Sequence, residues 1–180
     1  MNQRLNQRLN QRLAVVSEAR WPEAGDREVP AVPGFVLSSL NPLVAEVTER
    51  CLRPIYGEPP VPAEAGRSTA MIVVSASGDL TSAKHVARTV DARGRVGPLF
   101  FFQSVPNSIV GHVAARWGLR GPVVCLCPVG DPMPDGLAQA ALLIEDGDAT
   151  AAVVVLVEQS GTDGERATAA AVLVDGGSER

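Results

Sequence analysis

The apolar run ATAAVVVLV at residues 149–157 most constrains how this 180-residue chain can fold. It has about half of the roughly 20 residues that a helix needs to cross a membrane. Its flanks are acidic and polar, so it is predicted to be a strand buried in the core. A second apolar run, STAMIVVSASG at 68–78, is predicted to be another buried strand that ends in small residues.

Helical patterns separate these strands along the chain. The predicted strands are 12–21, 68–78, 123–127, 151–158 and 168–174, and the predicted helices are 41–55, 81–92, 107–117 and 133–146. Such alternation indicates an α/β domain with a mostly parallel central sheet covered by helices. The polar connection QSGTDGER predicts that the last two strands form an antiparallel hairpin. With 46% hydrophobic residues the chain can bury one core, so we expect one domain over 14–176 and a short tail at 177–180.

Three copies of the unit NQRL fill residues 2–13. Their leucines would form only a narrow stripe on a helix, which favours a disordered extension over 1–13; a docking helix is the alternative. The segment has no apolar core of a secretory signal and lacks the serines of a transit peptide. We therefore expect a cytoplasmic protein.

Charge and cysteine content narrow the range of partners. The net charge is −4 and the sequence pI is about 5.2, so nothing favours binding to nucleic acid or to an anionic membrane. Of the three cysteines, Cys125 and Cys127 lie two residues apart on a predicted strand, a spacing that does not suit a disulfide. This pattern indicates a reducing compartment. Cys51 lies on the buried face of the helix 41–55, for which Asn41 is the predicted N-cap.

The segment 97–122 is the most distinctive part of the chain. It holds three of the four phenylalanines, as Phe100, Phe101 and Phe102, just before a Pro-Asn turn. In the helix that follows, Ile109, Val113 and Trp117 share one face, and Ser108, His112 and Arg116 share the other. His112 is thus predicted on a polar stripe, and the other histidine, His85, on the surface.

The run NSIVGHVAARWGLRGP, the strand after it, the helix ending in EDGDA and the strand AAVVVLVEQ together resemble the N-terminal half of β-ketoacyl synthases. The chain is most similar to the short partner subunits called chain-length factors. Glycines and a proline fall where the family carries them, at Gly111, Gly118, Gly121, Pro122 and Gly147. The resemblance covers residues 13–175, is specific over 97–158, and implies a thiolase-like half with one βαβαβαββ-type repeat, without cofactor or metal.

The same resemblance implies that the chain is not catalytic by itself. The family's nucleophilic cysteine follows the Gly-Pro strand, where a helix N-terminus lowers its pKa and its backbone N–H holds an oxyanion. Counted from Pro122, that position is Gly130, and Cys127 lies three residues too early. Asp131 suits the N-cap of the next helix, where its carboxylate would raise the pKa of a neighbouring thiol. The two histidines that support condensation belong to the family's second half, and neither His85 nor His112 falls on a matching position.

A chain-length factor pairs with an active β-ketoacyl synthase and closes off the acyl tunnel of that partner, which builds a polyketide or polyene held on an acyl carrier protein. The resemblance gives six candidates for the tunnel wall or the subunit interface: Phe102, Val105, Ser108, Ile109, Val110 and His112. Each could instead belong to the chain's own structure, and for Ile109 this is at least as well supported. Two other functions stay open: a diverged acyltransferase or thioesterase with Cys127 as nucleophile and His112 as base, and a homodimeric scaffold that binds carrier proteins.

Overall fold

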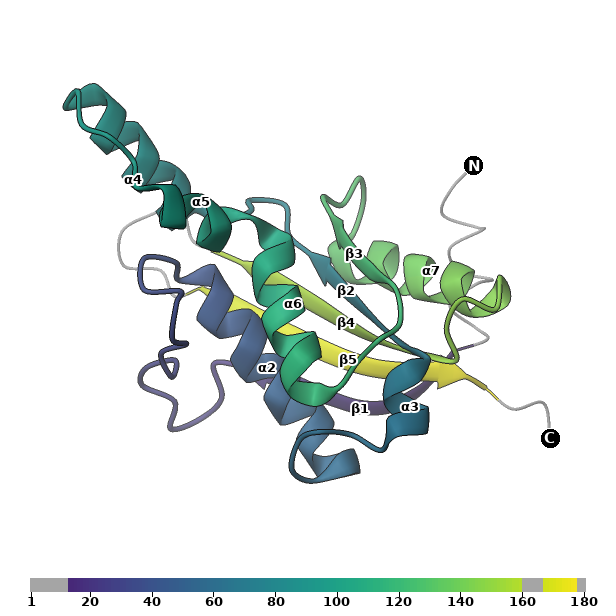
Figure 1. The fold of residues 1–180 in the computed structure, drawn as a ribbon. Coiled ribbons are helices and arrows are strands. Elements are labelled where there is room, and N and C mark those ends of the chain that lie inside the picture. The colour runs from purple at the N-terminus through teal and green to yellow at the C-terminus, as the bar shows by residue number, and fades with distance from the viewer. Residues whose placement is uncertain (1–12, 160–166, 178–180) are drawn as a thin grey trace.

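The computed structural model describes residues 13–159 and 167–177 (Figure 1). The extension expected at the N-terminus and most of the expected C-terminal tail lie outside these residues. So does the turn of the predicted hairpin. The described chain forms one sheet with helices on both of its faces.

The sheet has five strands in the order β1-β5-β4-β2-β3. The strands are β1 (Leu13–Trp21), β2 (Thr69–Val74), β3 (Val123–Leu126), β4 (Ala151–Glu158) and β5 (Thr168–Gly176). β2 runs parallel to β3 and β4, whereas β5 is antiparallel to both β4 and β1. Four of the five strands therefore run in the same direction. This confirms the α/β class, the mostly parallel sheet and the C-terminal hairpin.

Six helices connect and cover these strands within the described residues. They are α2 (Leu40–Tyr56), α3 (Ala63–Arg67), α4 (Leu80–Asp91), α5 (Pro98–Ser104), α6 (Pro106–Trp117) and α7 (Pro132–Glu145). α3 and α5 were not predicted, because five and seven residues are too few to show a helical period. α2 and α6 cover one face of the sheet and α7 covers the other (Figure 1).

The two faces are packed with side chains of different size. Between α2, α6 and the sheet, large side chains such as Leu43, Ile109 and Trp117 are almost completely buried. On the other face α7 lies close to the sheet at Gly136, where a Cβ atom would be 2.6 Å from Val154 Cγ1 and 2.8 Å from Val74 Cγ2. Glycine is therefore required at this helix position by the close approach of the backbone to the sheet.

The start of α2 differs from the prediction. The helix begins at Leu40 and its N-cap is Ser39, not Asn41. The Ser39 side chain makes no capping hydrogen bond, and the N–H of Asn41 donates to Ser38 Oγ at 3.0 Å. The buried Asn41 side chain instead donates from Nδ2 to the carbonyl of Gln103 at 2.8 Å. Asn41 thus ties the first turn of α2 to the end of α5, a contact that only the tertiary structure creates.

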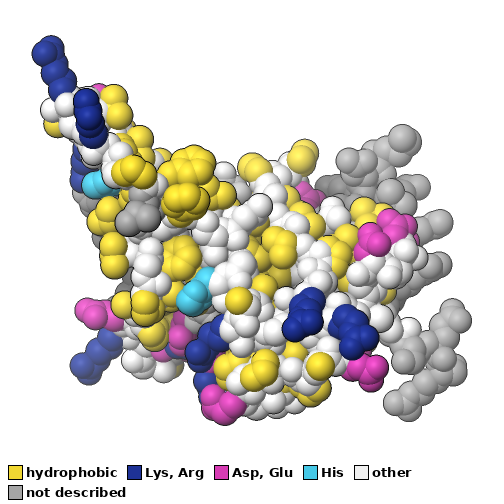
Figure 2. Space-filling view, in the orientation of Figure 1, with side chains coloured by type: hydrophobic (Ala, Val, Ile, Leu, Met, Phe, Trp, Pro, Cys, Tyr) yellow, Lys and Arg dark blue, Asp and Glu magenta, His cyan; other side chains and the backbone are white. Residues whose placement is uncertain are grey.

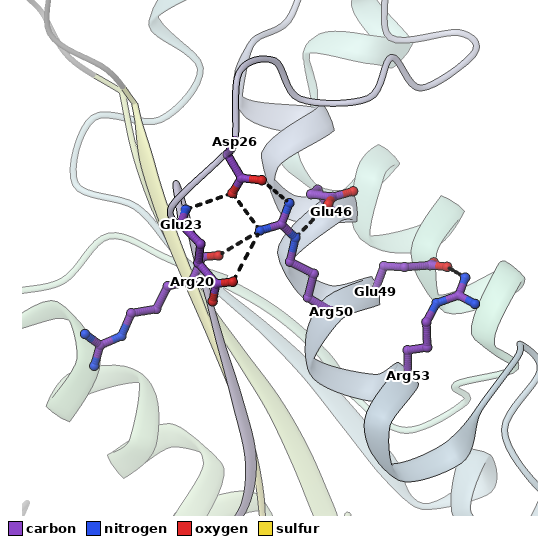
Figure 3. A network of polar contacts seen from close by, with 7 residues as sticks. All are labelled: Arg20, Glu23, Asp26, Glu46, Glu49, Arg50 and Arg53. Carbon is purple, nitrogen blue, oxygen red and sulfur yellow. Dashed lines mark hydrogen bonds and ion pairs between the residues drawn. The ribbon is translucent and has the colours of Figure 1, made fainter.

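A network of polar contacts holds the long connection between β1 and α2 (Figure 3). Arg50 of α2 donates to both carboxylate oxygens of Asp26, at 2.7 and 2.9 Å, and to Glu46 at 2.7 Å. Its guanidinium also lies 4.9 Å from the centre of the Trp21 ring. The carboxylate of Asp26 accepts a further hydrogen bond, at 2.8 Å, from the N–H of Glu23. A connection without helix or strand is thereby fastened to the body at one arginine.

Candidate functional site

The turn between β3 and α7 contains the position predicted for the nucleophile. Gly130 is exposed there, one residue before the N-cap of α7 at Asp131. A Cβ atom at Gly130 would meet only the Asp135 carboxylate, at 3.6 and 3.8 Å, which is ordinary contact distance. The backbone therefore leaves room for a side chain, and the sequence supplies none.

The carboxylate of Asp135 occupies the backbone donors of this turn. Its Oδ2 accepts the N–H groups of Val129 and Gly130, each at 2.8 Å. The prediction for Asp131 is correct in position only, because its side chain makes no capping hydrogen bond. The bonds that Asp135 accepts, from its place in the first turn of α7, are different, because Val129 and Gly130 precede the N-cap. The N–H of Gly130, which an oxyanion would need, is thus directed at a negative charge of the chain itself.

The contacts of Asp135 were not predicted from the sequence. The signal available was an acidic residue in the first turn of a predicted helix, a common stabilising position near the positive end of the helix dipole. That signal does not say which N–H groups the carboxylate meets. The pairing with Val129 and Gly130 depends on the shape of the turn.

The three cysteines lie in different surroundings. Cys51 is fully buried, donates to the carbonyl of Ser17 at 3.6 Å, and has its pKa raised by burial, as expected of a core residue. Cys125 is exposed to solvent. Neighbouring atoms still desolvate its thiol in part, and this raises the pKa of the thiol. Cys127 is exposed at the end of β3, with Sγ at 4.0 Å from the Ala76 carbonyl and 3.9 Å from that of Pro128, which are long, weak contacts.

His112 lies on a different surface feature. Its ring meets the ring of Phe35 edge-on, with the centroids 5.7 Å apart. It lines a cavity of about 390 Å³ between α2, α6 and the loop 30–33. Among the described residues no hydrogen bond joins His112 to Cys127. The structure therefore does not bring together the nucleophile and base of the acyltransferase alternative.

The tunnel and interface candidates divide into buried and accessible residues. Ile109 and Val110 are fully buried in the core beneath α6, which favours the intramolecular interpretation for both. Val105 and Ser108 are partly buried, and Phe102 is 65% exposed. Phe101, 66% exposed, meets Phe102 edge-on with 6.0 Å between ring centroids. Figure 2 shows hydrophobic side chains gathered on this part of the surface.

The sheet has an open edge at β3. β3 pairs with β2 on one side and is the last strand of the described sheet on the other. It contacts α6, which in turn contacts α5. Exposed apolar side chains continue around the edge, with Val123 at 45% and Val129 at 98% exposure. An unpaired strand edge and exposed aromatic rings are each typical of a surface that binds another protein.

The described residues contain neither a cluster of metal-ligating side chains nor a helix that could cross a membrane. No cluster of three or more His, Cys, Asp or Glu residues there is placed to hold a metal ion. None of the helices in that part of the chain has the length and apolar character needed to cross a membrane.

Comparison with solved structures places this fold among ketosynthases. A ketosynthase in complex with its chain length factor from Xenorhabdus doucetiae aligns with a TM-score of 0.69 at 19% identity, over 93% of this chain and 80% of that one. The ishigamide ketosynthase/chain length factor aligns with a TM-score of 0.69 at 19% identity, over 87% and 50%. A β-ketoacyl synthase from Burkholderia phymatum aligns with a TM-score of 0.70 at 13% identity, over 92% and 59%.

The chain thus spans about half to three-fifths of the length of two of these three structures. No curated protein sequence matches it. The family described as beta-ketoacyl synthase, N-terminal domain, matches residues 61–163, more than half of the chain. With its thiolase-like sheet, the helices on both faces and this match, the chain belongs to the β-ketoacyl synthase family.

Proposed function

We propose that this chain is a non-catalytic, chain-length-factor-type subunit that pairs with an active β-ketoacyl synthase and bounds its acyl tunnel in polyketide or polyene biosynthesis. The observation that carries the proposal is the turn at Gly130. It has no thiol to acylate, and the Asp135 carboxylate engages the N–H groups of Val129 and Gly130. Both features oppose acyl transfer at this position.

The open edge of β3 and the exposed aromatic rings of α5 support the pairing with a ketosynthase. In ketosynthase-like dimers this strand and the flanking helices lie at the subunit contact. Here Phe101 and Phe102 of α5, which packs on the flanking helix α6, expose about two-thirds of their surface, and aromatic residues frequently dominate binding energy. Phe102 is the strongest candidate for the wall of the partner's tunnel, with Val105 and Ser108 beside it. An acyl carrier protein would reach the chain through the complex.

Co-expression with the active ketosynthase, followed by affinity purification and size-exclusion chromatography, tests the pairing. We expect the two chains to elute together. A chain that is monodisperse alone and forms no complex would overturn the proposal, and a stable homodimer that retains a carrier protein would support the scaffold alternative.

Incubation with iodoacetamide or an acyl thioester, read by intact mass, tests the non-catalytic half. We expect no acyl transfer to the chain from the thioester. Rapid acylation of Cys127 that is lost in Cys127→Ser would instead assign the chain to the acyltransferase class.

A further inference from the structure

The segment 80–104, called the arm below, extends from the body of the protein. It comprises α4, the turn after it and α5, and Figure 1 shows α4 projecting beyond the sheet and the other helices. Of the twelve residues of α4 only Ser82 is buried. A helix with so little burial gains little stability from packing in the isolated chain.

The root of the arm is firmly attached. Gln159, which is 8% exposed, accepts the N–H of Thr81 at 3.3 Å and donates from Nε2 to Ser39 Oγ at 2.7 Å. Ser39 Oγ and Thr81 Oγ1 lie 2.7 Å apart. Asp79 caps α4 by accepting the N–H of Ser82 at 3.1 Å. The direction of the arm is therefore set by the body.

The charge of the arm is opposite to that of the rest of the chain. It contains four basic side chains, Lys84, Arg88, Arg93 and Arg95, and one acidic side chain, Asp91, a net charge of +3. Because the whole chain carries −4, the remainder carries −7. All four basic residues are exposed, and none has a side-chain partner within the described part of the chain. Figure 2 shows Lys and Arg side chains at the free end of the arm.

An apolar stripe runs beside these charges. Ala83, Val86, Ala87 and Val90 lie on one side of α4, with Val90 60% exposed, and Lys84 and Arg88 follow one residue after Ala83 and Ala87. At 100° per residue the two cations flank the stripe along one side. The arm thus presents an apolar surface bordered by positive charge. At its root, Phe101 and Phe102 of α5 are also exposed.

We infer that the arm docks the chain onto an acidic surface of the ketosynthase subunit, a step that rests on the proposed function. Charge complementarity selects a partner with local negative charge, and the apolar stripe requires a shallow apolar recess within it. An anionic membrane or a nucleic acid fits less well. Either is an extended polyanion that would repel the body, with its net charge of −7, as the arm approached.

The test measures binding of the full chain to the active ketosynthase at 50 and 500 mM NaCl. At 50 mM NaCl we expect Arg88→Glu/Arg95→Glu to weaken binding at least about tenfold, mainly through slower association. At 500 mM NaCl the charges are screened, so this variant and the unmodified chain should bind about equally weakly. Arg88→Lys/Arg95→Lys should bind like the unmodified chain. The matched control, Arg27→Glu/Arg67→Glu, reverses two exposed charges outside the arm and should show much less loss.

The remaining outcomes separate failure of the docking inference from failure of the proposed function. Equal binding of the arm variant and the control at low salt overturns the inference and leaves the proposed function intact. Absence of a complex with every form, including the unmodified chain, removes both. Arm-dependent binding to vesicles containing phosphatidylglycerol, to the carrier protein alone, or to a second copy of this chain, without charge dependence toward the ketosynthase, also overturns it.

Discussion

The body and the arm of this protein use their apolar residues in opposite ways. In the body, side chains such as Trp117 and Ile109 are completely enclosed between α6, α2 and the sheet. In the arm and at its root, Val90, Phe101 and Phe102 each expose at least 60% of their surface. Both regions are apolar in sequence, yet only the body obtains folding free energy from that character. Substitutions of buried residues in the body should therefore affect stability, and substitutions of exposed residues in the arm should affect association.

The largest effect is expected in the body. Trp117→Ala should lower the free energy of unfolding by about 3–5 kcal/mol, because it removes a large side chain that is 1% exposed. Urea unfolding followed by circular dichroism measures the loss. The matched arm variant, Val90→Ala, should change it by less than about 0.5 kcal/mol. Similar losses in both would mean that the arm is packed in the isolated chain.

Phe102→Ala should have the opposite profile. We expect the complex with the ketosynthase to weaken by about 1–4 kcal/mol, as for a buried aromatic residue in an interface, with little change in the unfolding of the isolated chain. Titration calorimetry and urea unfolding give the two numbers. Val36→Ala, at a site that is 80% exposed in the connection before α2, is the control for binding. Equal losses in stability and affinity would place Phe102 in the core.

The turn at Gly130 offers a chemical test. In a background with Cys125 and Cys127 changed to serine, Gly130→Cys should fit, but its thiol would lie beside the Asp135 carboxylate, which raises its pKa. Adding Asp135→Asn should lower that pKa and speed alkylation by iodoacetamide about tenfold near pH 7. Alkylation rates measured over pH 6–10 for the two variants give the pKa of the thiol with and without the Asp135 carboxylate. Coincident pH profiles would mean that Asp135 does not influence the site.

The smallest expected effect is in the ion pairs of α2. Burial acts to raise the pKa of Glu49, but hydrogen bonds from Arg116 and Arg53 outweigh it, so the net pKa is below the ordinary value of 4.5. The stabilisation is therefore complete above about pH 4.5 and is lost as the pH falls through the lowered pKa of the folded state. Glu49→Gln should reduce the difference in unfolding free energy between pH 7 and pH 3 by less than about 1 kcal/mol. An unchanged difference would show that these pairs contribute nothing.

Periodicity in the sequence predicts most of the body. The strand at 151–158 and the helix at 107–117 lie within a residue of their predicted bounds, because long apolar patterns reflect burial directly. Asn41 shows where this reasoning ends. Its local pattern indicates an N-cap, whereas its amide reaches Gln103, 62 positions later in the chain. The arm could not be predicted either. α4 has the amphipathic pattern of a packed helix, yet only Ser82 of its residues is buried, and a ring contact joins its His85 to Phe100 of α5.

For the candidate site, the position of the key residue was predicted but its contacts were not. The resemblance selects Gly130, and the structure places it in an exposed turn before α7. It does not indicate that Asp135 engages the neighbouring N–H groups, because that contact depends on the backbone path of the turn. Ile109 and Val110 match tunnel positions by alignment, yet burial in their own core leaves them no exposed surface. Position in an alignment fixes the place of a residue along the chain, and packing determines whether it is accessible.

The attachment of the β1–α2 connection by Arg50 has a consequence for proteolysis. This connection lacks helix and strand and contains Arg27, so by composition it resembles a site for trypsin. Its bidentate pairing through Asp26 restrains the backbone one residue before Arg27 and opposes the local opening that cleavage requires. Arg93 and Arg95 lie in the exposed turn of the arm without such a restraint. Within the described residues, a brief digestion should therefore cut first near residue 94, and a bound partner that covers the arm should protect that bond.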